Sequence, residues 1–142
     1  MPVKRHPALQ QLSRDHHHAL VVVQRLKRAD EANGHEARDG FLAYWNDEGR
    51  HHFRQEEEIL LPACAEYLDV QQPVVGKVLT DHVLIRHLAD LVSGEDPQPT
   101  LLRDLGSRLE QHIRCEEREL FPLIEQSIPD AELRRLVELL TR

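Results

Sequence analysis

The sequence predicts an all-α fold, namely an antiparallel up-down four-helix bundle with a short extra C-terminal helix. Apolar residues recur at steps of three and four through most of the 142 residues, which is the period of an amphipathic helix. No comparable segment alternates as a half-buried strand does, and aromatic residues, which favour strands, make up only 4% of the chain. The length suits one domain, so we expect a single domain over residues 1–142, with the bundle at about 7–126.

Four apolar stripes predict the four long helices. The stripes run from Leu9 to Leu26, from Leu42 to Ala63, from Val75 to Val92 and from Leu102 to Leu123. Each stripe lies along one face of its helix, so each helix can bury one side against the others. Long helices joined by short connections pack most simply as antiparallel neighbours.

Turn-forming residues separate these helices. Asn33 and Gly34 are a stop signal after the first helix, Pro73 suits the first turn of the third, and Ser93–Pro99 is rich in loop-forming residues. A short last helix is expected at about 130–141, with apolar residues on one face. We expect this helix to lie across one end of the bundle or to form an oligomer contact, and a homodimer stays open.

Charge and hydropathy exclude several classes of protein. Eighteen Lys and Arg against 25 Asp and Glu give a net charge of −7, which argues against nucleic acid and anionic membrane surfaces as partners. The first six residues contain no apolar stretch typical of a secretion signal, and the longest apolar runs are too short to span a membrane. Cys64 and Cys115 form no Cys-x-x-Cys pair, so we expect free thiols and a cytoplasmic protein.

One block of residues occurs twice. His52 and His112 are each followed by Glu four and five positions later and by Pro ten positions later. A second, weaker matched pair is Asp15-His16 and Asp81-His82. The chain is therefore interpreted as two helical hairpins that supply the same chemical groups.

Six polar side chains occupy positions where the apolar stripes predict core. They are His16, His52, His82, His112, Glu56 and Glu116. Burying two unpaired carboxylates would cost many kcal/mol or force them to stay protonated. A divalent or trivalent cation removes this conflict, because carboxylates and imidazoles are its ligands. Two such helices facing each other could bridge two metal ions through two carboxylates.

Other polar residues are assigned to different surroundings. His17, His18 and His51 lie on polar faces and are expected in solvent or as outer residues that support the ligands, whereas His87 is ambiguous because it lies off the main stripe. Glu117, together with Glu57, Glu58 and Glu119, is expected on a solvated charged face, and Glu117 is kept as a lesser candidate ligand. Pro62 and Pro122 are expected to end or kink their helices.

The two blocks and the two Asp-His pairs resemble the hemerythrin-like, HHE cation-binding domain from about Leu9 to Ile124. The resemblance implies a four-helix bundle around a non-haem di-iron centre. In it, the four stripe histidines are ligands and Glu56 and Glu116 bridge. The roles it implies are binding or sensing of oxygen or nitric oxide, iron handling, defence against peroxide or nitrosative stress, and repair of iron–sulfur clusters.

Two positions depart from the oxygen-carrying members of that family. Arg86 stands where they have a second histidine of the third helix, and Glu116 stands one position before their fourth-helix aspartate. One metal ion would then be short of a ligand and open to water, a diatomic or peroxide-type molecule, or His87. Arg86 would bring positive charge close to the centre, so a site for a single metal ion stays an alternative.

Binding or sensing is favoured over turnover, because no nucleophile–base pair and no phosphate-binding loop is present. Whether the protein is an enzyme is left open. Zinc could replace iron, since imidazole and carboxylate suit both metals. A metal-free helical interaction module is a further alternative. A ferritin-type oxidase needs Glu-x-x-His on two helices, and only Glu48 with His51 fits, off the apolar stripe.

Overall fold

The structure, a computed structural model, describes residues 4–94, 96 and 98–142. Residues 1–3, 95 and 97 lie outside this description. The first three belong to the N-terminal segment considered above, and the other two belong to the predicted loop at 93–99. The described residues form five helices and no strands. Three of the helices are uninterrupted: α1 spans Pro7–Lys27, α5 spans Pro73–Val92 and α8 spans Asp130–Leu140.

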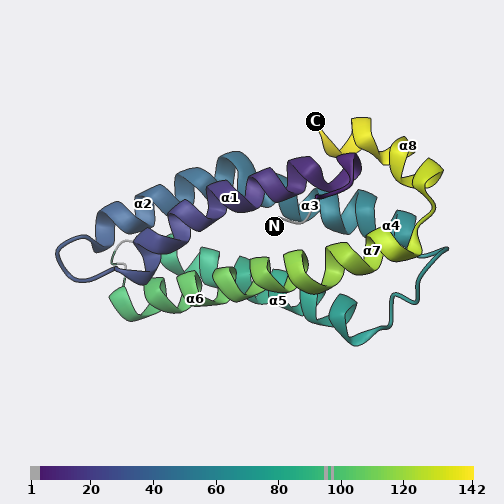
Figure 1. The fold of residues 1–142 in the computed structure, drawn as a ribbon. Coiled ribbons are helices and arrows are strands. Elements are labelled where there is room, and N and C mark those ends of the chain that lie inside the picture. Colours follow the sequence, from purple (N-terminus) through teal and green to yellow (C-terminus); the bar gives the residue numbers. More distant parts are fainter. Residues whose placement is uncertain (1–3, 95, 97) are drawn as a thin grey trace.

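The other two long helices contain short π-helical turns. The second helix is built from α2 (Gly34–Tyr44), η1 (Trp45–Gly49), α3 (Arg50–Gln55), η2 (Glu56–Leu60) and α4 (Leu61–Cys64). The fourth is built from α6 (Pro99–Cys115), η3 (Glu116–Leu120) and α7 (Phe121–Ser127). The four long helices run side by side and reverse direction in turn, which confirms the predicted bundle (Figure 1).

Asn33 and Gly34 belong to the start of the second helix rather than to the end of the first. The first helix ends at Lys27, and Asn33 directly precedes α2. The side chain of Asn33 accepts a hydrogen bond from the backbone N–H of Asp30 and donates one to the carbonyl of Arg28. Its polar side chain therefore stabilises the turn between the helices, whereas the prediction placed it as a stop signal.

Pro62 and Pro122 were predicted to end or kink their helices, and neither proline ends its helix. Each follows a π-helical turn in which the backbone N–H of the preceding residue, Leu61 or Phe121, bonds to the carbonyl of Glu56 or Glu116. The wider turn accommodates a residue that has no N–H to donate, and the helix continues beyond it. Both π-helical turns begin at one of the two predicted bridging glutamates.

The apolar core consists of two clusters separated by a polar layer. Along α1, Leu12 belongs to one cluster and Ala19 to the other, and His16 lies between them. Along α5, His82 lies in the same way between Val78 and Ile85. The same face of each helix thus carries apolar residues at both ends and a histidine in the middle.

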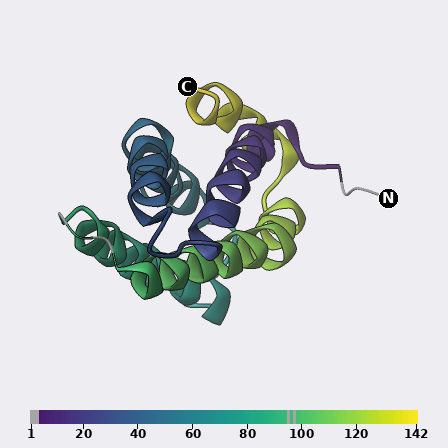
Figure 2. The same ribbon diagram turned by 90° about the vertical axis from the view of Figure 1, so that its left-hand side faces the viewer.

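The short helix α8 lies on the outside of the bundle against α1 and η2 (Figure 2). Leu133, Leu136 and Leu140 are buried and complete the apolar cluster that contains Leu12. At roughly 1.5–3 kcal/mol for each buried leucine, this contact holds α8 firmly. The sequence left open whether the apolar face of α8 would meet one end of the bundle or another molecule. Its three buried leucines pack against helices of the same chain.

Two smaller expectations concern the cysteines and the membrane. Cys64 and Cys115 are free and buried, and burial raises the pKa of the Cys64 thiol to about 12. Among the helices of the described residues, none combines the length and the apolar composition that a bilayer crossing needs.

Candidate metal centre

The six polar residues predicted in the core come together in the middle of the bundle. They form two groups of possible metal ligands, and within each group the ligand atoms lie within 4.8 Å of one another. One group contains His16, His52, Glu56 and Glu116, and the other contains His82, His112, Glu56 and Glu116. Both glutamates are completely buried, at 0% exposure. The groups overlap through these two carboxylates.

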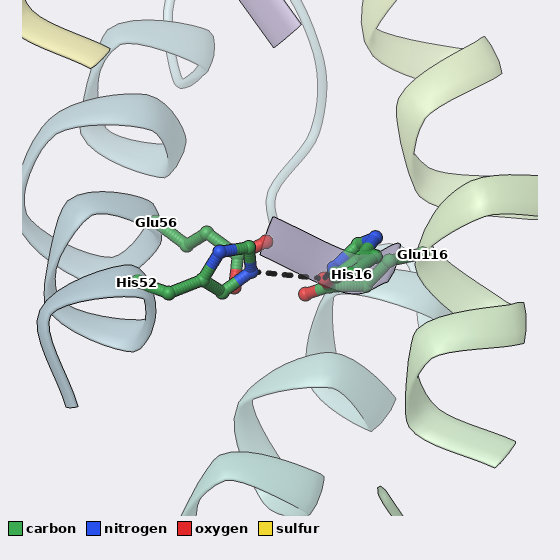
Figure 3. A group of neighbouring side chains, drawn as sticks. All are labelled: His16, His52, Glu56 and Glu116. Carbon is green, nitrogen blue, oxygen red and sulfur yellow. Dashed lines mark hydrogen bonds and ion pairs between the residues drawn. The ribbon is translucent and has the colours of Figure 1, made fainter. Parts of the chain in front are cut away.

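The first group joins α1 and the second helix to the fourth (Figure 3). The Nε2 atom of His16 lies 2.8 Å from Oε1 of Glu116, and Nε2 of His52 lies 3.8 Å from the same oxygen. His52 also faces Oε1 of Glu56 at 3.4 Å. The two imidazoles and two carboxylates thus converge on one point.

The second group repeats this arrangement with α5 and the fourth helix. Oε2 of Glu116 lies 3.2 Å from Nε2 of His112 and 3.6 Å from Nε2 of His82. Oε1 of Glu56 lies 3.3 Å from Nε2 of His82. Glu116 therefore directs one oxygen to each group, which is the geometry of a carboxylate that bridges two ions. Each group contains two histidines and shares the same two glutamates. The presence of Arg86 in place of a further third-helix histidine therefore does not leave one group with fewer protein donors than the other.

The hydrogen-bond inventory of the core tests whether these residues fit a metal. In the described part of the chain, six buried side-chain N and O atoms lack a hydrogen-bond partner, and all six belong to this cluster. They are Nε2 of His52, His82 and His112, both carboxylate oxygens of Glu56, and Oε2 of Glu116. An unpartnered buried polar atom costs roughly 1–3 kcal/mol, so this concentration is unfavourable without a cation and is resolved by one.

A carboxylate on the far side of each imidazole orients it. The Nδ1 atoms of His16 and His82 lie 2.7 and 2.6 Å from carboxylate oxygens of Glu117 and Glu57. Those of His52 and His112 lie 3.0 and 3.2 Å from Asp15 and Asp81. A proton held on Nδ1 leaves the Nε2 lone pair directed at the centre, which is the tautomer that binds a metal.

These four carboxylates were not assigned this role from the sequence. Glu57 and Glu117 were expected on a solvated face, but their side chains are 29% exposed and each bonds a histidine of the other hairpin. Glu117 is thus beside the centre without belonging to either group of ligands. The signal was present in the repeat, because Asp directly precedes His16 and His82 and a second Glu directly follows each bridging Glu.

Each of these outer glutamates also pairs with an arginine that lies over a phenylalanine ring. Arg86 contacts Glu57 at 3.0 Å and covers the ring of Phe53, which stacks on His82 at 3.9 Å between ring centroids. In the same way, Arg5 contacts Glu117 at 3.4 Å and covers Phe121, which stacks on His16. The positive charge of Arg86 is therefore directed to Glu57.

The other histidines lie away from the centre. His87, the ambiguous candidate, is exposed on α5 and lines a surface hollow with Asp104 and Arg108. His17, His18 and His51 are exposed, as their polar faces predict.

In the absence of metal, attraction between the imidazoles and the carboxylates offsets part of the cost of burying the cluster. Burial opposes protonation of His82, but the close carboxylates of Glu116 and Glu56 outweigh it and raise the pKa of His82 to about 10. Burial acts likewise on His112, and the charge of Glu116 and the hydrogen bond to Asp81 raise its pKa to about 9. Burial would raise the pKa of Glu116, but the neighbouring imidazoles hold it well below its usual range.

We expect the metal-free protein to lose stability as the pH rises from about 6.5 to 10. His82 and His112 have pKa values of about 10 and 9 in the folded state, above the unfolded value of about 6.5. Their contribution is complete below the unfolded pKa and disappears as the pH passes the folded values. Urea unfolding in the presence of a chelator measures this, and an unfolding free energy that stays constant over the interval would contradict it.

We expect the Glu57→Gln substitution to weaken metal binding by about 10–100-fold, because the amide no longer orients His82 as a carboxylate does. The neighbouring Glu58→Gln substitution is the matched control, since Glu58 is 61% exposed and pairs only with Arg54. Competition with a chelator of known affinity measures both. Equal affinities for the two variants would show that the outer carboxylate does not matter.

Fold and centre together define a cation-binding helical bundle. The chain belongs to the hemerythrin family, because residues 8–124 match the Hemerythrin HHE cation binding domain. No curated protein and no solved structure shows a significant match to it.

Proposed function

We propose that the protein binds two iron ions, one in each group of the centre, and presents them to dioxygen, nitric oxide or a peroxide. The observation that supports this most directly is the sharing of Glu56 and Glu116 by two groups that each contain two histidines. Two shared carboxylates suit a pair of ions better than a single one, because a single ion would leave two imidazoles of the other group without a partner.

The donor set suits zinc as well as iron, and we propose iron because it would keep positions open for a small ligand. Each ion would have four protein donors, two nitrogens and two oxygens, and no thiolate. Four donors satisfy tetrahedral zinc completely but leave positions free on six-coordinate iron. Bound iron would supply redox chemistry and open positions for a small ligand.

The residues of the chain hold, orient and enclose the ions. Glu56 and Glu116 neutralise charge, and the outer carboxylates keep the four Nε2 atoms directed inwards. The stacked rings of Phe53 and Phe121 restrict the orientation of two of the imidazoles. We place binding or sensing above turnover, because the described residues around the ions act as ligands, outer carboxylates and packed rings.

The test is the metal content of untagged protein purified from cells grown with added iron. We expect about two irons per chain, together with a change in the visible spectrum when nitric oxide is added to the ferrous protein. One ion per chain would support the alternative of a single metal site. Zinc alone under these conditions, or no metal in a folded protein, would overturn the proposal.

A further inference from the structure

The centre is enclosed, so an ion needs a route to it. Glu56 and Glu116 are 0% exposed and His52 is 3% exposed. A hollow of about 270 Å³ lies on the outer side of His52, and Asp15, which bonds Nδ1 of His52, forms part of its wall. An ion that reaches Asp15 is separated from the centre by one imidazole ring.

The wall of this hollow carries ligands for a divalent cation. Asp47 and Glu48 come from η1 and His51 from α3, and they join Asp15 around the same space. Thr141 and Arg142 also line it, so the wall carries three carboxylates and one guanidinium. Asp15 accepts its second hydrogen bond from the neutral amide of Gln11 at 3.0 Å, so among the described residues no Lys or Arg side chain bonds its carboxylate, and its one charged partner is the imidazole of His52.

Gln55 gives an independent indication that the hollow receives a ligand. Its side chain is only 4% exposed and lines the hollow. Its amide has no hydrogen-bond partner among the described residues, yet it is not one of the enclosed unpartnered atoms of the core, so it opens onto the hollow. Its carbonyl oxygen is a suitable ligand for a hard or borderline cation passing inwards.

The internal repeat provides a comparison surface on the other hairpin. Asp81 holds His112 as Asp15 holds His52, but there Lys77 and Arg108 lie 3.3 and 4.0 Å from the carboxylate. The repeat aligns Lys77 with Gln11 and Arg108 with Glu48. The two sides of a nearly symmetric centre thus differ in charge: the side over Asp15 is acidic and the side over Asp81 is basic.

We infer that the acidic hollow is the port through which a divalent cation enters the centre, with Asp47, Glu48 and His51 as its transient ligands. The donors at the port do not form a compact group like the two at the centre, whose atoms lie within 4.8 Å of one another. They therefore bind the ion weakly and release it inwards. Their negative charge raises the local concentration of cations and the rate of uptake. This inference rests on the proposed metal-binding function.

The test is the rate at which metal-free full-length protein takes up Co²⁺, followed by visible absorption under excess metal. We expect the double variant Asp47→Asn/Glu48→Gln to slow uptake about tenfold or more at low ionic strength, a size that electrostatic attraction accounts for. The final amount of bound metal should not change. The matched control, Glu31→Gln/Glu36→Gln, removes two charges from exposed positions near the connection between α1 and α2 and should keep the original rate.

The outcomes separate this inference from the proposed function. If the unmodified protein takes up no Co²⁺, the metal-binding function itself fails. If it loads fully and the double variant loads equally fast, only the port is excluded. If the double variant instead binds less metal at equilibrium, Asp47 and Glu48 act on the centre itself, and the port is again excluded. Added salt should slow uptake by the unmodified protein much more than by the double variant.

Discussion

Replacing Glu56 with glutamine is expected to reduce the metal content from two ions per chain to less than one. The carboxylate of Glu56 faces His52 and His82 at 3.4 and 3.3 Å, and so serves both groups. A neutral amide has one oxygen that binds metal weakly and cannot join two cations. The loss should therefore exceed the roughly 10–100-fold fall in affinity expected for an outer substitution. Elemental analysis and chelator competition give the readout.

The repeat supplies the controls for this experiment. Glu116→Gln should cause a similar loss, because Glu116 is the corresponding residue of the second block and also faces both groups. Glu58→Gln should retain both ions. A Glu56→Gln protein that keeps its full iron content would contradict the assignment of Glu56 as a bridge.

Removing the metal is expected to lower the melting temperature by roughly 10–15 °C. A ligand present at about 1,000 times its dissociation constant stabilises the folded state by about 4 kcal/mol, and each kcal/mol moves the melting temperature of a domain of this size by a few degrees. The physical cause is the set of unpartnered buried atoms that remain when the cation leaves.

Scanning calorimetry before and after dialysis against a chelator measures this difference, and restoring the metal should restore the melting temperature. An unchanged melting temperature after complete removal of metal would favour the alternative of a metal-free helical module. The polar layer between the two apolar clusters would then need a different explanation.

The central residues could be predicted because their signal is local. His16, His52, His82 and His112 stand where an apolar stripe requires core, and burial of such groups is costly unless they are paired or bound. The helix period alone therefore placed all six side chains on the inner faces. The overall bundle followed from the same period and from the short connections.

The outer carboxylates could not be assigned in this way. Glu57 is one position after Glu56 and thus about 100° around the helix, on a face that is polar in sequence. Whether it meets solvent or a histidine of another helix depends on how the two helices are rotated against each other. The same holds for Pro62, because a π-helical turn keeps the helix continuous where the residue type alone predicts an interruption.

The outer hydrogen bonds also cross between the two halves of the chain. Asp15 and Asp81 orient a histidine of their own hairpin, whereas Glu117 and Glu57 orient His16 and His82 of the opposite one. A hairpin separated from its counterpart would keep two histidines and one central glutamate but would lack half of this orientation. Two peptides obtained by opening the chain between α4 and α5 should therefore reassemble with the cation as a template. In this respect the domain consists of two hairpins with the same pattern of ligands, each of which orients a histidine of the other.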